Sequence, residues 1–345
     1  MNYYIGLDAH TQTCTAVVVD ERGEQKIRET FKTTEANLVK FLSRIQGTKK
    51  SLTFEECGIA QWLYATCLDY VDELIVCNPV YLAKKQGAKT DYRDALHLAQ
   101  ELRTNHLKPV YHDNSKWMAL RSLSNNYLSL VDDIVRSKNR LKAVFRSSMV
   151  STEGGKFYVE KLRAQEIKNS QSRFVADRLY AQIEAMEEEK VRYKTEFKTN
   201  LKRYRPIENL TSVPGIDLIR ASITVAVVCQ PERFKNKHEF WGYCMLVRHI
   251  QMSAGKIYGN KRVHGRKELR DIFIGAAESA IRGENSLRVH YESQRLKGAA
   301  HRDAKLSVAR KIAAICLSLL KNNDTFKDDF DVQQLERAKL RKNIL

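Results

Sequence analysis

Along the first hundred residues, the spacing of apolar positions switches between the period of a strand and the period of a helix. Residues 3–26 carry β-branched and aromatic runs that predict two strands closing on a turn at Arg22-Gly23, and a third strand is predicted near 27–33. Helices and strands then alternate. The predicted helices are 34–45, 58–70 and 91–103, and the predicted strands between them are 51–56 and 73–79. An opening meander followed by this alternation indicates an α/β layer fold.

The order of these predicted elements is that of ribonuclease-H-like domains. Thr34 is a suitable N-cap for the first helix, and Glu35 follows in its first turn, where an acid is favoured. A basic loop at 84–90 precedes the helix that begins near Asp91. We therefore predict an α/β domain over residues 1–112.

The middle of the chain has a different pattern. Between Pro109 and Pro206 there is no proline, and the only glycines are the pair Gly154-Gly155. On both sides of this pair the apolar residues step by three and four, as on one face of a helix. They are Trp117, Leu120, Tyr127, Val131, Ile134, Leu141 and Phe145, then Leu179, Ile183, Met186, Tyr193 and Phe197. We predict a helical hairpin or coiled coil over 113–205, suited to dimerisation or to reaching along a nucleic acid.

After Pro206 the sequence predicts a compact, mainly helical domain over 206–322, with a peripheral, charge-balanced tail at 323–345. Its first stretch, TSVPGIDLIR, has the form of a helix-hairpin-helix turn, which offers backbone N–H groups to a phosphate. Residues 248–270 carry seven Lys and Arg, and helices rich in alanine and isoleucine follow to about residue 322.

Composition narrows the class of protein. Of 345 residues, 43% are hydrophobic and 29% charged, which argues against wholesale disorder. No run approaches the roughly 18 apolar residues of a membrane span, and the start has no signal-peptide pattern, so we expect neither a membrane protein nor a secreted one. Seven scattered cysteines without C-x-x-C spacing indicate reduced thiols in a cytoplasmic protein and argue against a structural zinc site.

Charge points to the partner. Lys and Arg number 59 against 41 acidic residues, a net charge of +18, which favours a polyanion. Residues 1–110 carry 14 basic and 14 acidic side chains, so the whole excess lies later in the chain. It amounts to +7 over 111–210 and +11 over 211–322. A neutral first part and a basic remainder predict chemistry in one and nucleic-acid binding in the other.

Four carboxylates stand where such a fold can gather them. Asp8 lies inside the first predicted strand, Glu55 near the end of strand 51–56, and Asp91 and Asp94 on one face of a helix. Clustered carboxylates repel one another unless a cation neutralises them, and oxygen ligands select Mg²⁺ or Mn²⁺. Singly, Asp91 could be an N-cap, Asp94 a first-turn acid and Glu55 a solvated charge. The combination favours a metal site that acts on phosphodiesters.

Four sequence blocks carry this acidic set. They are Tyr4-Ile5-Gly6-Leu7-Asp8, Phe54-Glu55-Glu56-Cys57-Gly58, Cys77-Asn78-Pro79 and Lys89-Thr90-Asp91-Tyr92-Arg93-Asp94-Ala95. In this order they resemble the DEDD transposases of bacterial insertion sequences, the IS110 family, which is related to the Piv-type DNA invertases. The resemblance implies a RuvC-like domain in which Asp8, Glu55, Asp91 and Asp94 hold Mg²⁺. Glu55 is preferred to Glu56 because the family glutamate stands three residues before a glycine, here Gly58.

The resemblance resumes over residues 206–290. Val213-Pro214-Gly215-Ile216 is similar to the family's Pro-Gly-Ile-Gly, with Asp217 in place of the second glycine, where a carboxylate would repel DNA. A family segment with glycine, Leu-Arg and Ala-Ala is matched by Gly265, Leu269-Arg270 and Ala276-Ala277. Spacing from Gly265 makes Ser253 the counterpart of the family's nucleophilic serine. The usual Ser-Gly is here Ser253-Ala254-Gly255, and the proline usually found before it is missing.

From the residues alone, Ser253 is a turn residue, and Tyr258 is a rival nucleophile of the tyrosine-recombinase type. No orderly set of Arg and His surrounds Tyr258, which argues against that rival. Basic residues near Ser253 suit a phosphate surface, although such a run is usually a solvated face. They are Arg248, Lys256, Lys261, Arg262, Arg266 and Lys267.

The resemblance implies a bacterial, nucleoid-associated enzyme for site-specific DNA recombination through a covalent phosphoserine. Magnesium or manganese would orient the scissile phosphate, and a structured non-coding bridge RNA would select target and donor DNA. In the family the serine and the acidic site come from different protomers, which implies a dimer or tetramer. Two alternatives stay open: a RuvC-like structure-specific endonuclease that uses water and does not need Ser253, and a non-catalytic nucleic-acid-binding protein such as a domesticated transposase.

Overall fold

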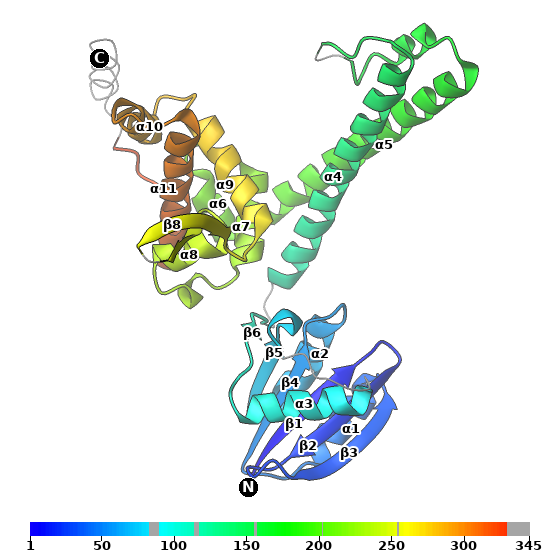
Figure 1. Cartoon of the computed structure of the whole chain (residues 1–345), viewed down its shortest axis with the longest axis vertical. Helices are drawn as coiled ribbons and strands as arrows, with labels where there is room; N and C mark the ends of the chain where they lie inside the picture. The colour runs from blue at the N-terminus through cyan, green and yellow to red at the C-terminus, as the bar shows by residue number, and fades with distance from the viewer. Residues whose placement is uncertain (83–89, 114–116, 155–156, 202, 254, 330–345) are drawn as a thin grey trace. The chain divides into compact units, whose positions relative to one another are not determined.

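The computed structural model describes residues 1–82, 90–113, 117–154, 157–201, 203–253 and 255–329. It divides the chain into two compact units, Met1–Ser115 and Lys116–Leu345 (Figure 1). The predicted basic loop lies outside the described residues except for Thr90, and so does the predicted tail from residue 330 onward. The finer division of the second part at 205/206 stays a prediction.

The first unit is built on a mixed sheet with the strand order β3-β2-β1-β4-β5-β6. Strands β1, β4 and β5 are parallel, whereas β2 and β3 form an antiparallel meander with β1, and β6 is antiparallel to β5. The strands are β1 Asn2–Ala9, β2 Thr13–Val19, β3 Gln25–Lys32, β4 Lys49–Glu55, β5 Glu73–Cys77 and β6 Pro109–Val110. The five predicted strands are confirmed, and the two-residue β6 was not predicted.

Helices cover both faces of this sheet. On one face, Ile5 and Leu7 of β1 share a buried core with side chains of α1 (Glu35–Arg44) and α2 (Ala60–Cys67). Thr34 caps α1 as predicted, because its side chain accepts a hydrogen bond from the Asn37 N–H. The 3-10 helix η1 (Leu68–Tyr70) follows α2 directly, so the predicted helix 58–70 is confirmed in two pieces.

The other face is covered by α3 (Asp91–Arg103), which packs on β1 and β2 (Figure 1). A Cβ atom at Gly6 would lie 2.1 Å from the Ala95 carbonyl oxygen and 2.6 Å from the Ala99 nitrogen. Only glycine therefore lets the α3 backbone lie directly on β1. This close approach brings the first turn of α3 to the carboxyl end of β1.

The second unit begins with the predicted pair of long helices, α4 (Trp117–Ser147) and α5 (Ser170–Leu201), which pack against each other. The break is longer than the predicted glycine pair, because residues 148–154 and 157–169 form a cap that includes the 3-10 helix η3 (Lys161–Glu166). The far half of this hairpin has its own core, which includes Phe145, Phe157 and Tyr180.

The near ends of α4 and α5 join the core of the C-terminal helices, because Leu120, Tyr127 and Phe197 pack there. Those helices are α6 Arg205–Thr211, α7 Leu218–Val228, α8 Lys237–Tyr243, α9 Lys267–Ala280, α10 Ser286–Leu296 and α11 His301–Asn322, with the 3-10 helix η4 Pro231–Arg233. Among the described helices, none combines the length and hydropathy that a membrane span requires.

One element of the second unit was not predicted. The sequence predicts only a basic stretch here, but β7 (Arg248–Ser253) and β8 (Lys256–Arg262) form an antiparallel hairpin. The hairpin contains Ser253 and four of the predicted nucleic-acid-binding residues.

Candidate metal centre and nucleic-acid interface

Asp8 lies near the carboxyl end of β1, on the face that α3 covers, because it follows Gly6 by two positions. Its side chain is 20% exposed, and its Oδ2 lies 3.5 Å from Nε2 of His10. Burial raises the pKa of Asp8 above its usual value, His10 lowers it, and the nearby carboxylates of Asp91 and Asp94 raise it further. A charged Asp8 is therefore costly in this place until a cation neutralises the group.

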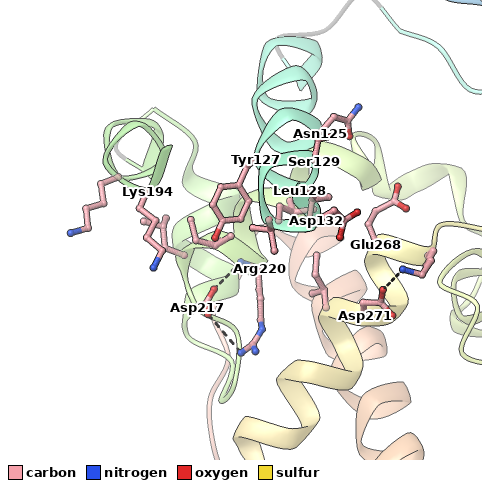
Figure 2. Close-up of a pocket in the computed structure, with 17 residues that line it drawn as sticks. Asn125, Tyr127, Leu128, Ser129, Asp132, Lys194, Asp217, Arg220, Glu268 and Asp271 are labelled. Atoms are coloured by element: carbon pink, nitrogen blue, oxygen red, sulfur yellow. Dashed lines mark hydrogen bonds and ion pairs between the residues drawn. The ribbon is translucent and has the colours of Figure 1, made fainter. Parts of the chain in front are cut away.

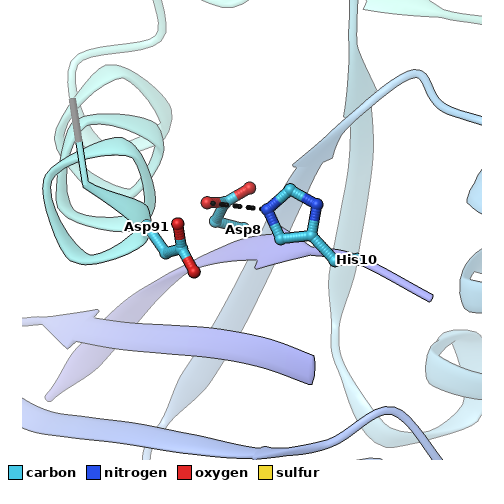
Figure 3. Close-up of side chains that lie close together, drawn as sticks. All are labelled: Asp8, His10 and Asp91. Atoms are coloured by element: carbon cyan, nitrogen blue, oxygen red, sulfur yellow. Dashed lines mark ion pairs between the residues drawn. The ribbon is translucent and has the colours of Figure 1, made fainter. Parts of the chain in front are cut away.

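The first turn of α3 supplies the next two carboxylates. The interpretation of Asp91 as the N-cap is wrong, because Thr90 caps the helix: its Oγ1 accepts from the Arg93 N–H at 3.3 Å. Asp91 is the first helical residue instead. Ligand atoms of Asp8, His10 and Asp91 all lie within 4.8 Å of one another (Figure 3). This spacing allows one ion to be bound by all three side chains.

Glu55 comes from the neighbouring parallel strand. Leu7 pairs with Phe54 in the register of β1 and β4, so Asp8 and Glu55 each follow at the carboxyl end of their strand. Phe54 packs on the α1 and α2 face, so alternation directs Glu55 to the α3 face, as it does Asp8. Among the described residues, the group within 4.8 Å does not include Glu55 or Asp94. The structure thus brings two of the four predicted ligands together and directs the others to the same side.

Glu56, the competitor of Glu55, is bound to another side chain. Its Oε2 lies 2.5 Å from Nε2 of His112, whose other ring nitrogen lies 2.8 Å from Oε1 of Gln61. The His112 side chain is only 6% exposed, and its ring packs against Tyr64. Glu56 therefore anchors the segment that follows β6, which favours Glu55 as the ligand.

A titration with Mn²⁺ is expected to distinguish the roles of Glu55 and Glu56. Glu55→Gln should weaken Mn²⁺ binding by more than about tenfold, because it removes a charged ligand. Glu56→Gln should leave Mn²⁺ affinity unchanged and lower the free energy of unfolding by about 1 kcal/mol, since a charged hydrogen bond to His112 is lost. Calorimetric titration and urea unfolding measure the two effects. The reverse pattern would make Glu56 the ligand.

His10 is a functional candidate that the sequence reasoning missed. It follows Asp8 by two positions, one residue past the end of β1, and that short spacing to the predicted ligand was a usable signal. Imidazole is a good ligand for transition metals, whereas Mg²⁺ prefers oxygen. A site that includes His10 accommodates Mn²⁺ as readily as Mg²⁺.

In the second unit, the predicted nucleophile Ser253 is the last residue of β7 and pairs with Lys256 across the hairpin turn. Gly255 in this turn has a φ of +75°, a conformation that favours glycine. Ser253 and Lys256 are both exposed. The serine is therefore presented at the tip of a hairpin, beside a basic side chain.

The other predicted nucleic-acid-binding residues follow the hairpin into α9. Arg248 and Lys261 are exposed on the strands, and Arg262 lies in β8 with its side chain outside the described part of the structure. At the start of α9, Arg266 lies 3.9 Å from Glu268 and Lys267 lies 3.0 Å from Asp271. These exposed ion pairs are weak, so both cations can exchange a carboxylate for a phosphate.

The predicted helix-hairpin-helix turn lies between α6 and α7, but its phosphate site is closed. Gly215 has a φ of +89°, and a Cβ there would lie 2.2 Å from the Ala276 carbonyl oxygen. Asp217 caps α7: its carboxylate accepts the Arg220 N–H at 2.8 Å and lies 3.7 Å from the Arg220 guanidinium. The N-terminus of α7 therefore already has its anion.

An open hollow of about 850 Å³ lies beside Asp217, between α4, α5, α7 and α9 (Figure 2). Acidic and basic side chains line it in equal number. They are Asp132, Asp217, Glu268 and Asp271, with Lys194, Lys198, Arg220 and Lys267. Balanced charge does not concentrate a polyanion, so the hollow is not a phosphate site.

The fold and these side chains define a protein with a candidate metal centre in one unit and a basic surface in the other. Its first unit carries carboxylates at the carboxyl ends of parallel strands, an arrangement suited to a divalent cation. Its second unit is mainly helical and presents a basic hairpin.

Comparison with known proteins identifies the family within this class. Residues 5–150 match the DEDD transposases of IS110, described as "Transposase", and residues 207–292 match the "Transposase IS116/IS110/IS902 family". The chain belongs to the IS110 family of transposases, as its motifs predicted. It is also 23% identical over 119 residues to the "Insertion element IS110 uncharacterized 43.6 kDa protein" of Streptomyces coelicolor. That match covers 34% of this chain and 29% of the relative, less than a third of the relative's length.

Proposed function

We propose that this protein is the transposase of an insertion sequence, a recombinase that cuts and rejoins DNA through a divalent cation and a serine nucleophile. The observation that carries the proposal is the group of Asp8, His10 and Asp91 at the end of β1. This group lies in the unit that matches the DEDD transposases. A water-using nuclease shares such a group, so the role of the serine is decided by experiment.

We further propose that the first unit is a RuvC-like, ribonuclease-H-like domain. Its strand order supports this, because an antiparallel β3-β2-β1 meander continues into the parallel strands β4 and β5. The helix α3 then brings its acidic first turn to the end of the central strand.

In this proposal Asp8, Glu55, Asp91 and Asp94 hold Mg²⁺ or Mn²⁺. A cation held there would neutralise the carboxylates and polarise the scissile phosphate. Asp8 gains most, because burial and two neighbouring acids disfavour its charged form. His10 lies against Asp8 and adds a nitrogen donor to the group.

Ser253 supplies the nucleophile. Its Oγ forms a bond to phosphorus, the bond from phosphorus to the departing DNA oxygen breaks, and the serine proton ends on that oxygen as a free hydroxyl. Attack of a second DNA hydroxyl on the phosphoserine reverses these changes and joins new strands. Ser253 and the carboxylates lie in different units, and we propose that they meet between protomers of a homo-oligomer.

We propose that the basic residues after residue 110 bind both DNA and a guide RNA. After residue 110 the chain has 45 basic and 27 acidic residues, and this excess of positive charge supports more than one polyanionic partner. We propose that the RNA pairs with target and donor DNA, while the protein binds both mainly through phosphates.

The test is a trapping assay with the full chain, its co-purifying RNA, nicked element-end DNA and Mg²⁺. We expect a protein–DNA adduct on a denaturing gel that disappears in Ser253→Ala and in Asp91→Asn. Ser170→Ala, which alters an exposed serine of the helical hairpin, should form the adduct normally and serves as the matched control.

Two other outcomes would replace the proposal. Cleavage without an adduct, unaffected by Ser253→Ala, would identify an endonuclease that uses water. Tight binding with neither adduct nor cleavage would identify a non-catalytic nucleic-acid-binding protein.

A further inference from the structure

The β7–β8 hairpin bears large apolar side chains that no core cluster of the described residues includes. Ile250, Met252 and Ile257 are between 58% and 62% exposed, and we call these three the hairpin patch. Tyr258, beside them, is also exposed. Apolar side chains gathered in this way on a small element mark a binding surface.

The register places the hairpin patch on a single face. The register shifts between Gln251 and Met252, where Tyr258 is an extra residue on β8, so β7 keeps its regular alternation. Met252 pairs with Ile257, and Ile250 precedes Met252 by two positions on β7, so all three point the same way. Ser253 pairs with Lys256 on the opposite face, which is polar. The hairpin therefore carries its exposed apolar residues on one face, with Arg248 at the base of that face, and the proposed nucleophile at the tip of the other, polar face.

Such a hairpin needs a partner. A two-stranded ribbon is marginally stable in water when neither face is packed. Covering the hairpin patch removes apolar surface from water and fixes the strands that hold Ser253. The partner is thus expected to order the serine as it binds.

The positive charge of the hairpin segment indicates the chemistry of that partner. From Arg248 to Lys267 the sequence has six Lys and Arg and no acidic residue. A second copy of the same hairpin would bring like charges together, whereas a nucleic acid offers phosphates to the cations and bases to the apolar face. A β-ribbon can enter a DNA groove, and proteins that bind the minor groove wedge Ile and Met side chains between base steps.

We propose that the hairpin patch packs against the DNA bases beside the phosphate that Ser253 attacks, and unstacks them. This inference rests on the proposed function. The apolar face lies toward the bases, and Lys256 and Lys261 lie toward the backbone. The hairpin patch then positions Ser253 relative to the phosphate by packing against the neighbouring bases. Its three side chains take no part in the chemistry.

The test uses the full chain with its co-purifying RNA and element-end duplexes that carry 2-aminopurine at successive positions across the junction. Without added divalent ion, the wild type should raise the fluorescence several-fold at one or two adjacent positions, because the probe leaves the stack. The triple variant Ile250→Gln, Met252→Gln and Ile257→Gln should lose this rise. Its affinity for the duplex, measured by anisotropy, should stay within about tenfold, since phosphate contacts dominate affinity.

Matched variants separate the patch from general surface effects. Val135→Gln with Val191→Gln alters exposed apolar residues of α4 and α5 and should leave the fluorescence rise intact. Met252→Leu should also retain it, because apolar volume is kept. The single change Ile257→Gln should reduce the rise even if the triple variant folds poorly.

Three results would overturn the inference. Tight binding by the wild type with no fluorescence change at any position would exclude unstacking. Loss of an RNA-free oligomer in the triple variant, seen by sedimentation, would make a second copy the occupant. Binding to anionic vesicles that the triple variant loses would make a membrane the occupant. Failure of the wild type to bind element-end DNA at all would instead refute the proposed function, and this inference with it.

Discussion

Replacing Gly6 by alanine is expected to lower the free energy of unfolding of the first unit by about 3 kcal/mol or more, a large effect for one methyl group. The new Cβ would lie 2.1 Å from the Ala95 carbonyl oxygen. Either α3 moves away from β1 or the strand bends, because backbone atoms cannot yield as a flexible side chain does. Since α3 carries Asp91 and Asp94, Mn²⁺ binding should weaken with the packing.

Gly58→Ala is the matched control, because nothing lies within 4 Å of a Cβ built there. It follows β4 close to Glu55 and should change stability by less than about 0.5 kcal/mol. Urea unfolding followed by hydrogen exchange in β1 and α3 reports on the first unit by itself. Equal midpoints for the two variants would show that α3 does not lie on β1 at Gly6.

The parts of the fold that bury one face could be predicted from the sequence. Strands β1 and β2 and helices α1 and α3 each send a regular set of apolar side chains into a core, so the period of the pattern reveals the element. The long helices α4 and α5 were predictable for the same reason. The cap at 148–154 and 157–169 was not, because its structure depends on packing against both helices.

The β7–β8 hairpin escaped prediction because, in the part of the chain that the structure describes, the apolar side chains of its two strands are not buried. Ile250 and Met252 do alternate with polar residues, but the run is short and lies among many cations. A pattern of burial cannot reveal an element whose apolar side chains stay exposed in the folded chain.

The candidate site also has a part that could be predicted from the sequence and a part that could not. Asp8 and Asp91 were paired from the order of the elements, and the structure brings them together. The bond between Glu56 and His112 joins residues far apart in the sequence, and no local pattern encodes it. The cap of α3 was predictable in principle, because Thr90 is a preferred N-cap residue and stands directly before the helix.

Asp8→Asn is expected to stabilise the protein in the absence of metal and to lower recombination by more than about 100-fold, beyond the effect of losing a residue that only supports a ligand. Burial raises the pKa of Asp8, so the folded protein binds this proton more tightly than the unfolded chain does. Stability without metal therefore falls as the pH rises above the usual value of 3.8. Asparagine removes this loss, so the variant should melt at a higher temperature than the wild type at pH 7, and the difference should close toward pH 4.

Added metal is expected to reverse the order of the two melting temperatures. A cation that binds only the folded wild type adds about 2.7 kcal/mol of stability at one hundred times its dissociation constant, and Asp8→Asn should show almost none of this gain. Thermal melts at pH 7 with and without Mn²⁺ measure both effects, and Asp69→Asn, at an exposed aspartate of η1, should behave as the wild type does. A variant that is less stable without metal and still responds to Mn²⁺ would mean that Asp8 has a structural role only. The expected crossing of the two melting temperatures, in contrast, would show that the fold bears the cost of a buried carboxylate because the cation requires it.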